Sequence, residues 1–99
     1  MSIEYRADAN LRDEIVAALL DDVANGGAWS VVSRGERDLV LRWAAHVGSE
    51  TLSDANIEVA PDSVYLSVHA GTRRQRELLV HKMTRTLRAN GVEGSFKEL

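Results

Sequence analysis

The residues with the clearest potential for chemistry are three arginines, Arg73, Arg74 and Arg76, at the start of a predicted helix. A helix N-terminus presents free backbone amides and a partial positive charge, so arginines there are disfavoured unless an anion is bound. Arginine also binds phosphate and carboxylate groups through two parallel hydrogen bonds. The three arginines are therefore a candidate anion-binding site. The glycines and lysine of a phosphate-binding loop are missing, so a simple helix cap is the alternative.

The outer side of the same predicted helix, residues 73–89, is basic. The whole helix carries six of the twelve Lys and Arg residues of the chain and only one acid, Glu77. Leu78 lies among these basic residues rather than on the main apolar stripe, and an exposed leucine beside arginine is typical of protein interfaces. The alternatives are an ordinary solvated face and packing of Leu78 on a neighbouring helix. The interpretation as an interface predicts contacts with an acidic partner through Arg74, Leu78, Lys82 and Arg85.

The other predicted helix, residues 9–25, comes first in the chain and is acidic. Asp21 and Asp22 fall in its last turn, where the helix dipole disfavours anions, and Asp22 falls inside the predicted apolar arc. The alternative is a place for Asp22 at the helix edge or in a pair with an arginine. Adjacent helical residues point about 100° apart, so the two carboxylates do not converge for acid–base chemistry. The pattern predicts contacts with a basic partner through Asp13, Glu14, Asp21 and Asp22.

Other reactive residue types show no pattern that predicts catalysis. The histidines, His46, His69 and His81, lack metal-ligand spacing, so we expect no metal and no cofactor. Ser67, His69 and Asp62 carry no local signature of a nucleophile, so we expect no catalytic residues and treat an enzyme as the minor hypothesis. The chain has no cysteine, which excludes disulfides and thiolate chemistry.

Composition predicts a single domain over residues 1–99, with 44% apolar and 27% charged residues. The net charge of −3 does not support a general attraction to nucleic acid or to an anionic membrane. No apolar stretch is long enough to span a membrane, and no signal peptide is visible at the start. We therefore expect a cytoplasmic protein.

Alternating apolar residues predict several strands. They fall around Ile3 and Tyr5, in a hairpin with strands at 29–31 and 39–43 joined by 33–37, at 57–59, at 64–68, and around Val92 and Phe96. Residues 46–56 are expected to form a connection. The first helix has Asn10 or Asp8 as its predicted N-cap. Its predicted apolar face is Leu11, Ile15, Ala18, Leu19 and Val23.

The second helix begins with the spacing of a capping box, Thr72 and Gln75, and ends at Asn90-Gly91. Its predicted buried stripe is Leu79, Val80, Met83 and Leu87. The order β-α-β-β-(β)-β-α-β indicates an α+β fold. We expect both helices on one face of a largely antiparallel sheet of about four to six strands. The nearest general topology is ferredoxin-like with an added hairpin.

These observations favour a non-enzymatic protein–protein interaction domain. Its small size, acidic balance and lack of catalytic motifs are similar in type, though not in motif, to small bacterial inhibitor or toxin-immunity proteins. The alternative is an anion or nucleic-acid binder that uses the arginine-rich helix. A homodimer is a further hypothesis, with the acidic helix of one subunit on the basic helix of another.

Overall fold

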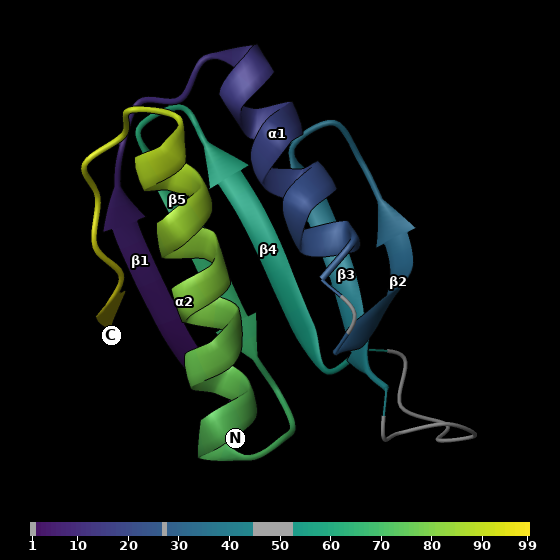
Figure 1. The fold of residues 1–99 in the computed structure, drawn as a ribbon. Helices are drawn as coiled ribbons and strands as arrows, with labels where there is room; N and C mark the ends of the chain where they lie inside the picture. Colours follow the sequence, from purple (N-terminus) through teal and green to yellow (C-terminus); the bar gives the residue numbers. More distant parts are fainter. Residues whose placement is uncertain (1, 27, 45–52) are drawn as a thin grey trace.

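The computed structural model describes residues 2–26, 28–44 and 53–99, which form two helices and one six-stranded sheet (Figure 1). The helices are α1 (Asp13–Ala24) and α2 (Arg73–Ala89). The strands are β1 (Ile3–Asp8), β2 (Trp29–Arg34), β3 (Asp38–Trp43), β4 (Ala55–Ala60), β5 (Ser63–Val68) and β6 (Lys97–Glu98). They lie in the order β2-β3-β4-β5-β1-β6, and every neighbouring pair is antiparallel. The predicted α+β class with an antiparallel sheet is confirmed.

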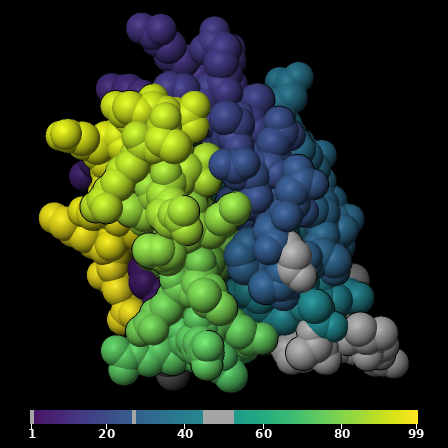
Figure 2. Space-filling model, in the orientation of Figure 1, coloured from purple at the N-terminus to yellow at the C-terminus, as the bar shows by residue number. Residues whose placement is uncertain are grey.

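Both helices lie on one face of the sheet and run in opposite directions beside each other (Figure 1). The space-filling view shows α2, in green to yellow, and α1, in blue, covering this face together (Figure 2). Among the described residues, no helix covers the other face. The fold is therefore two-layered, with a helical layer and an open sheet face. Neither helix in the described part of the chain is long and apolar enough to cross a membrane.

The core lies between the two layers. Alternate residues of β3, β4 and β5 point toward the helices, as the pleat of a strand requires. Those side chains are buried, whereas their neighbours on the open face are half-buried or exposed, apart from the buried Ser63. Full burial of such aliphatic side chains contributes about 1.5–3 kcal/mol each. The core residues of these strands are Leu39, Leu41, Trp43, Ala55, Ile57, Val59, Val64, Leu66 and Val68.

Two tryptophan side chains of the sheet make hydrogen bonds to the backbone near the ends of the helices. Trp29 and Trp43 are paired across β2 and β3, and their rings meet edge to face with centroids 6.0 Å apart. Trp29 Nε1 donates a hydrogen bond to the carbonyl oxygen of Val23 at 2.5 Å, at the end of α1. Trp43 Nε1 donates to the carbonyl oxygen of Ala70 at 2.6 Å, just before α2. Both tryptophans are buried in the core.

The structure places the start and the buried face of α1 differently from the prediction. The helix begins at Asp13 rather than at residue 9, and its N-cap is Arg12, with no side-chain cap. The reason is that β1 stays paired through Asp8, opposite Ser63, and the next amide, of Ala9, donates to the carbonyl oxygen of Asp62. Because this pairing keeps the chain extended through Ala9, the helix can begin only after it. The buried face is Val16, Leu19, Leu20 and Val23, with Ile15 half-buried.

The bounds and the cap of α2 agree with the sequence prediction. Thr72 Oγ1 accepts a hydrogen bond from the amide of Gln75 at 3.2 Å, and Gln75 Oε1 accepts from the amide of Thr72 at 2.7 Å. This reciprocal pair satisfies two amides that a helix start leaves free. The buried residues of α2 are Leu79, Met83, Thr86 and Leu87, so Thr86 takes the place predicted for Val80, which is half-buried.

The last strand is later and shorter than predicted. Lys97 and Glu98 pair with Arg6 and Tyr5 as β6. Val92 and Phe96 lie outside this strand and pack against the core from the connection after α2. Of the predicted connection at 46–56, residues up to 52, including His46, lie outside the described residues. Its last two residues belong to β4.

Candidate functional site

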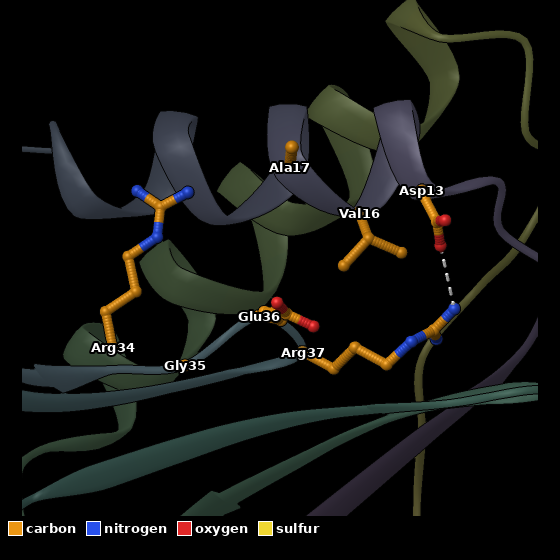
Figure 3. Close-up of a pocket in the computed structure, with 7 residues that line it drawn as sticks. All are labelled: Asp13, Val16, Ala17, Arg34, Gly35, Glu36 and Arg37. Carbon is orange, nitrogen blue, oxygen red and sulfur yellow. Dashed lines mark hydrogen bonds and ion pairs between the residues drawn. The ribbon is translucent and has the colours of Figure 1, made fainter.

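A groove with a volume of about 730 Å³ lies between α1 and the β2–β3 hairpin (Figure 3). The helix supplies one wall and the tight turn between the two strands supplies the other. The figure shows the side chains of the turn reaching up toward the helix. The lining residues are Asp13, Val16, Ala17, Arg34, Gly35, Glu36 and Arg37.

Ion pairs connect the hairpin to both ends of α1. Arg37 Nη2 lies 3.2 Å from Asp13 Oδ1 in the first turn of the helix. Arg34 Nη1 lies 2.7 Å from Asp21 Oδ1 in its last turns. All four side chains retain substantial contact with solvent, so each pair contributes about 0–1 kcal/mol. The pairs fix how the hairpin approaches the helix more than they stabilise the fold.

The groove has the chemistry of a structural junction rather than of a reaction centre. Its lining contains two guanidinium groups and two carboxylates, and the Arg34 guanidinium is already neutralised by Asp21. The described lining includes no histidine and no hydroxyl side chain that could act as a base or nucleophile. The exposed Glu36 is the lining carboxylate for which no ion pair is recorded among the described residues.

The four acidic residues predicted as partner contacts fall into two classes. Asp13 and Asp21 are engaged by the hairpin arginines. Glu14 and Asp22 are exposed, and within the described ranges no ion pair is recorded for them. The placement of Asp22 inside the apolar arc is wrong, because the buried face of α1 is rotated toward Val16 and Leu20. Asp22 is therefore an ordinary solvated residue at the helix edge.

The basic helix face, which we define as Arg74, Leu78, Lys82 and Arg85, forms a continuous surface on α2. The residues are spaced by four, four and three positions, which places them along one side of a helix. Arg74 and Arg85 are exposed, Lys82 is half-buried, and the Leu78 residue is 49% exposed. In the part of the chain that the structure describes, none of the three cations has an ion-pair partner.

The position of Leu78 excludes its burial against the neighbouring helix. The first turns of α2 extend beyond the end of α1, so that this part of α2 has no helix beside it (Figure 1). A half-exposed leucine surrounded by cations is not unusual by itself, since single apolar residues are common on surfaces. Its value as a signal comes from the cations beside it, Arg74, Lys82 and Arg85, for which no ion pair is recorded among the described residues.

The three arginines at the start of α2 do not converge. Arg73 Nε lies 2.9 Å from Glu77 Oε1, one turn along the helix. Arg74 is exposed on the outer side, and Arg76 is half-buried beside a small hollow that Ile3 and His69 also line. Around the helix, Arg74 lies about 100° from Arg73 and about 160° from Arg76, so Arg74 points away from the other two. The capping box also engages the amides of Thr72 and Gln75.

The other candidate groups are separated. Asp62 precedes β5 and His69 follows it, so six residues of extended strand, about 20 Å, separate them. His69 Nδ1 instead lies 2.7 Å from the hydroxyl of Ser2. His81 is on the exposed side of α2. The described residues contain no group of histidine and carboxylate side chains that could hold a metal ion.

Sequence reasoning missed the two hairpin arginines, Arg34 and Arg37. The available signal was their spacing of three across a tight turn that contains glycine, which places both on the short end of a hairpin. Their role depends on where α1 crosses that hairpin, which is a property of the tertiary fold.

Comparison of the sequence with protein-family models and with curated proteins finds no significant match.

Proposed function

We propose that this chain is a non-enzymatic protein-interaction domain that binds an acidic partner through the basic helix face. The observation that carries this proposal is the exposure of Leu78, which is 49%, beside Arg74, Lys82 and Arg85. For these three cations no ion pair is recorded among the described residues. Leucine supplies apolar contact, and the cations around it supply attraction and orientation. An acidic partner fits this surface better than a basic one fits α1, because Asp13 and Asp21 are already paired.

The class of binding protein that this proposal favours is a small inhibitor or immunity-type protein. Such a protein acts by covering a surface of its target and needs no catalytic group of its own. The groove beside α1, with its paired arginines, supports a structural role for the hairpin and leaves α2 as the contact surface. Electrostatic attraction would mainly increase the rate of encounter, so binding should weaken as salt increases.

The arrangement of strands supports a relation to the ferredoxin-like topology. The elements β1, α1, β4, β5, α2 and β6 follow a β-α-β-β-α-β order, and β2 and β3 form a hairpin between α1 and β4. This relation concerns the fold alone, because one fold of this kind hosts many functions. The function proposed above depends on the α2 surface.

The alternative, an anion or nucleic-acid binder, has less support. Arg74 points away from Arg73 and Arg76, and Arg73 is paired with Glu77. The helix α2 contains no Phe, Tyr or Trp that could stack on a base, and stacking on such side chains contributes much of single-strand binding.

Affinity capture with matched charge-reversal variants tests the proposal. The α2 variant is Arg74→Glu with Arg85→Glu, and the control is Glu14→Lys with Asp22→Lys on α1. The immobilised wild-type chain and the immobilised control should capture the same partner protein, and the immobilised α2 variant should not capture it. The recovered protein is then purified and titrated, and its affinity should fall at least tenfold for the α2 variant.

Two outcomes would contradict the proposal. One is a partner whose affinity is unchanged by reversal on both helices. The other is loss of binding with the α1 variant alone, which would indicate a basic partner. Binding of a single-stranded oligonucleotide at low salt that is lost in the α2 variant would support the anion-binding alternative instead.

A further inference from the structure

A row of charged side chains crosses the open face of the sheet at one level. The strand register places Lys97 opposite Arg6, Arg6 opposite Tyr65, Tyr65 opposite Glu58, and Glu58 opposite Asp38. Successive side chains of a strand point to opposite faces. The sequence neighbours of these residues in β1, β5, β4 and β3 are buried, apart from Tyr5, which is half-buried and packs against the core. The charged row therefore faces away from the helices. It is basic at one end and acidic at the other, with tyrosine in the middle.

Each end of the charged row places like charges side by side. Arg6 and Lys97 are directly opposite each other on neighbouring strands, and so are Glu58 and Asp38. Like charges in this position destabilise a sheet. Arg6 is partly compensated, because its Nε lies 2.9 Å from Asp8 and its guanidinium lies 5.4 Å from the centre of the Tyr65 ring. Lys97, Glu58 and Asp38 are exposed, with no ion pair recorded among the described residues.

We propose that the open sheet face binds a second copy of this chain, face to face, about a two-fold axis that runs along β5. This rotation reverses the charged row, so that its basic end lies over the acidic end of the other copy. Arg6 then lies over Glu58 of the partner subunit, Lys97 lies over Asp38 of the partner subunit, and the two tyrosines meet on the axis. A two-fold interface makes each of these contacts twice.

The residues two positions away from the charged row on each strand form a second row on the same face, and this row also fits the rotation. The amide of Leu99 donates to the carbonyl oxygen of Glu4 at 2.8 Å, so Leu99 continues the pairing of β6 and shares a face with Lys97. The residue is 70% exposed. Val40 is half-buried on β3 at the level of Asn56, Ser67 and Glu4. The rotation that pairs the charges also places Leu99 over Val40 of the partner subunit.

The acidic end of the charged row is hollowed. A depression of about 370 Å³ is lined by Asp38, Glu58 and Tyr65 together with Arg37, Val59 and Ala60. The guanidinium of Arg37 is already paired with Asp13, so the two acids leave this depression negatively charged. It can receive the Arg6 side chain of the partner subunit.

The size of the face predicts a weak dimer. Strands about 4.8 Å apart that rise about 3.3 Å per residue give β3, β4, β5 and β1 together an area of about 400 Å² per subunit. The total buried area is then below the roughly 1,200–2,000 Å² of stable complexes, so we expect dissociation constants in the micromolar range or weaker. Exposed charge pairs of this kind weaken as salt increases. This inference does not depend on the proposed function, because it uses the face of the sheet opposite the helices.

Sedimentation equilibrium of the full chain tests the proposal with two complementary variants. The acid-row variant is Arg6→Glu with Lys97→Glu, and the basic-row variant is Glu58→Lys with Asp38→Lys. The wild type should dimerise at about 1 mM protein in low salt, and self-association should weaken at least tenfold in about 0.5 M salt. Each variant alone should remain monomeric, whereas an equimolar mixture should form a heterodimer. Urea midpoints and circular dichroism check that both variants fold.

Several outcomes overturn the proposal. They include a wild-type chain that stays monomeric in low salt, variants that self-associate like the wild type, and folded variants that fail to associate when mixed. A dimer that is lost on reversal of Arg74 and Arg85 but kept in both row variants would place the interface on the helices. A dimer lost only in Val32→Lys, a 46% exposed residue of β2, would place it at the edge of the sheet.

Discussion

The junction before α2 depends on a glycine, and replacing it with alanine should destabilise the protein strongly. Gly71 has a φ of +115°, a conformation that residues with a Cβ rarely adopt. A Cβ there would overlap Trp43 Nε1 and would lie 2.7 Å from Gln75 Oε1. Gly71→Ala therefore disturbs the Trp43 hydrogen bond to Ala70 and the capping box of α2 together.

The expected magnitude follows from three costs. The backbone conformation costs about 1–2 kcal/mol for a residue with a Cβ. Crowding of the indole costs about 1–3 kcal/mol, and weakening of its hydrogen bond costs about 1 kcal/mol. Together these costs are about 3–6 kcal/mol, so we expect the free energy of unfolding to fall by at least about 3 kcal/mol, which lowers the melting temperature by at least about 12 °C in a domain of this size.

Gly91 provides a matched control. Its φ is +78°, and a Cβ there would meet no atom within 4 Å. Gly91→Ala should therefore cost the backbone term alone, about 1–2 kcal/mol. Urea unfolding followed by tryptophan fluorescence measures both variants. Equal losses of stability in the two variants would refute the reasoning, because they would show that the approach of Trp43 to Gly71 adds nothing.

Two further substitutions test the caps and the ion pairs of the helices. Thr72→Ala removes the acceptor for the Gln75 amide and should lower the free energy of unfolding by about 1 kcal/mol. Thr72→Ser keeps a hydroxyl acceptor and should cost little. Equal losses of stability in the two variants would contradict the capping-box assignment. Asp21→Asn removes the partner of Arg34 and should change the unfolding free energy by less than about 1 kcal/mol, because the Asp21 side chain is 60% exposed. A larger change in urea unfolding would show that this pair holds the hairpin on α1.

The part of the fold that could be predicted from sequence is the part specified locally. The bounds of α2 follow from a capping box at its start and from Asn90 and Gly91 at its end, and its apolar residues recur with one helical period. The strand β3, and β5 from Val64 onward, alternate cleanly between buried and open positions. In these segments propensity, capping and periodicity all indicate the same structure.

The first helix could not be placed correctly, because its sequence allows more than one buried face. Residues 15–20 are all apolar, so a stripe centred on Ile15 and one centred on Val16 and Leu20 fit almost equally well. Tertiary contacts decide between them, including the hydrogen bond from Trp29 to Val23. The start of the helix depends on how far β1 stays paired with β5, which no local pattern encodes.

The predicted site residues show the same division. The spacing of the basic helix face is encoded in one helix, so its members could be identified from the sequence. The engagement of Asp13 and Asp21 could not, because it needs the hairpin to lie beside α1. A pair across a fold of this kind joins residues that are 13 to 24 positions apart in the chain.

The charge asymmetry between the helices has a different meaning once the hairpin is included. Arg34 and Arg37 offset two of the four acids of α1, whereas the basic helix face keeps its cations without recorded ion-pair partners among the described residues.

The helices and the charged row lie on opposite faces of the sheet, so a dimer through the row leaves α2 exposed in both subunits. Such a dimer would present two basic helix faces to an acidic partner. A partner that is itself dimeric or repetitive would then bind more tightly than one copy of α2 allows, through effective concentration alone. The acid-row variant, which keeps α2 intact, should lose this gain and retain the affinity of a single site.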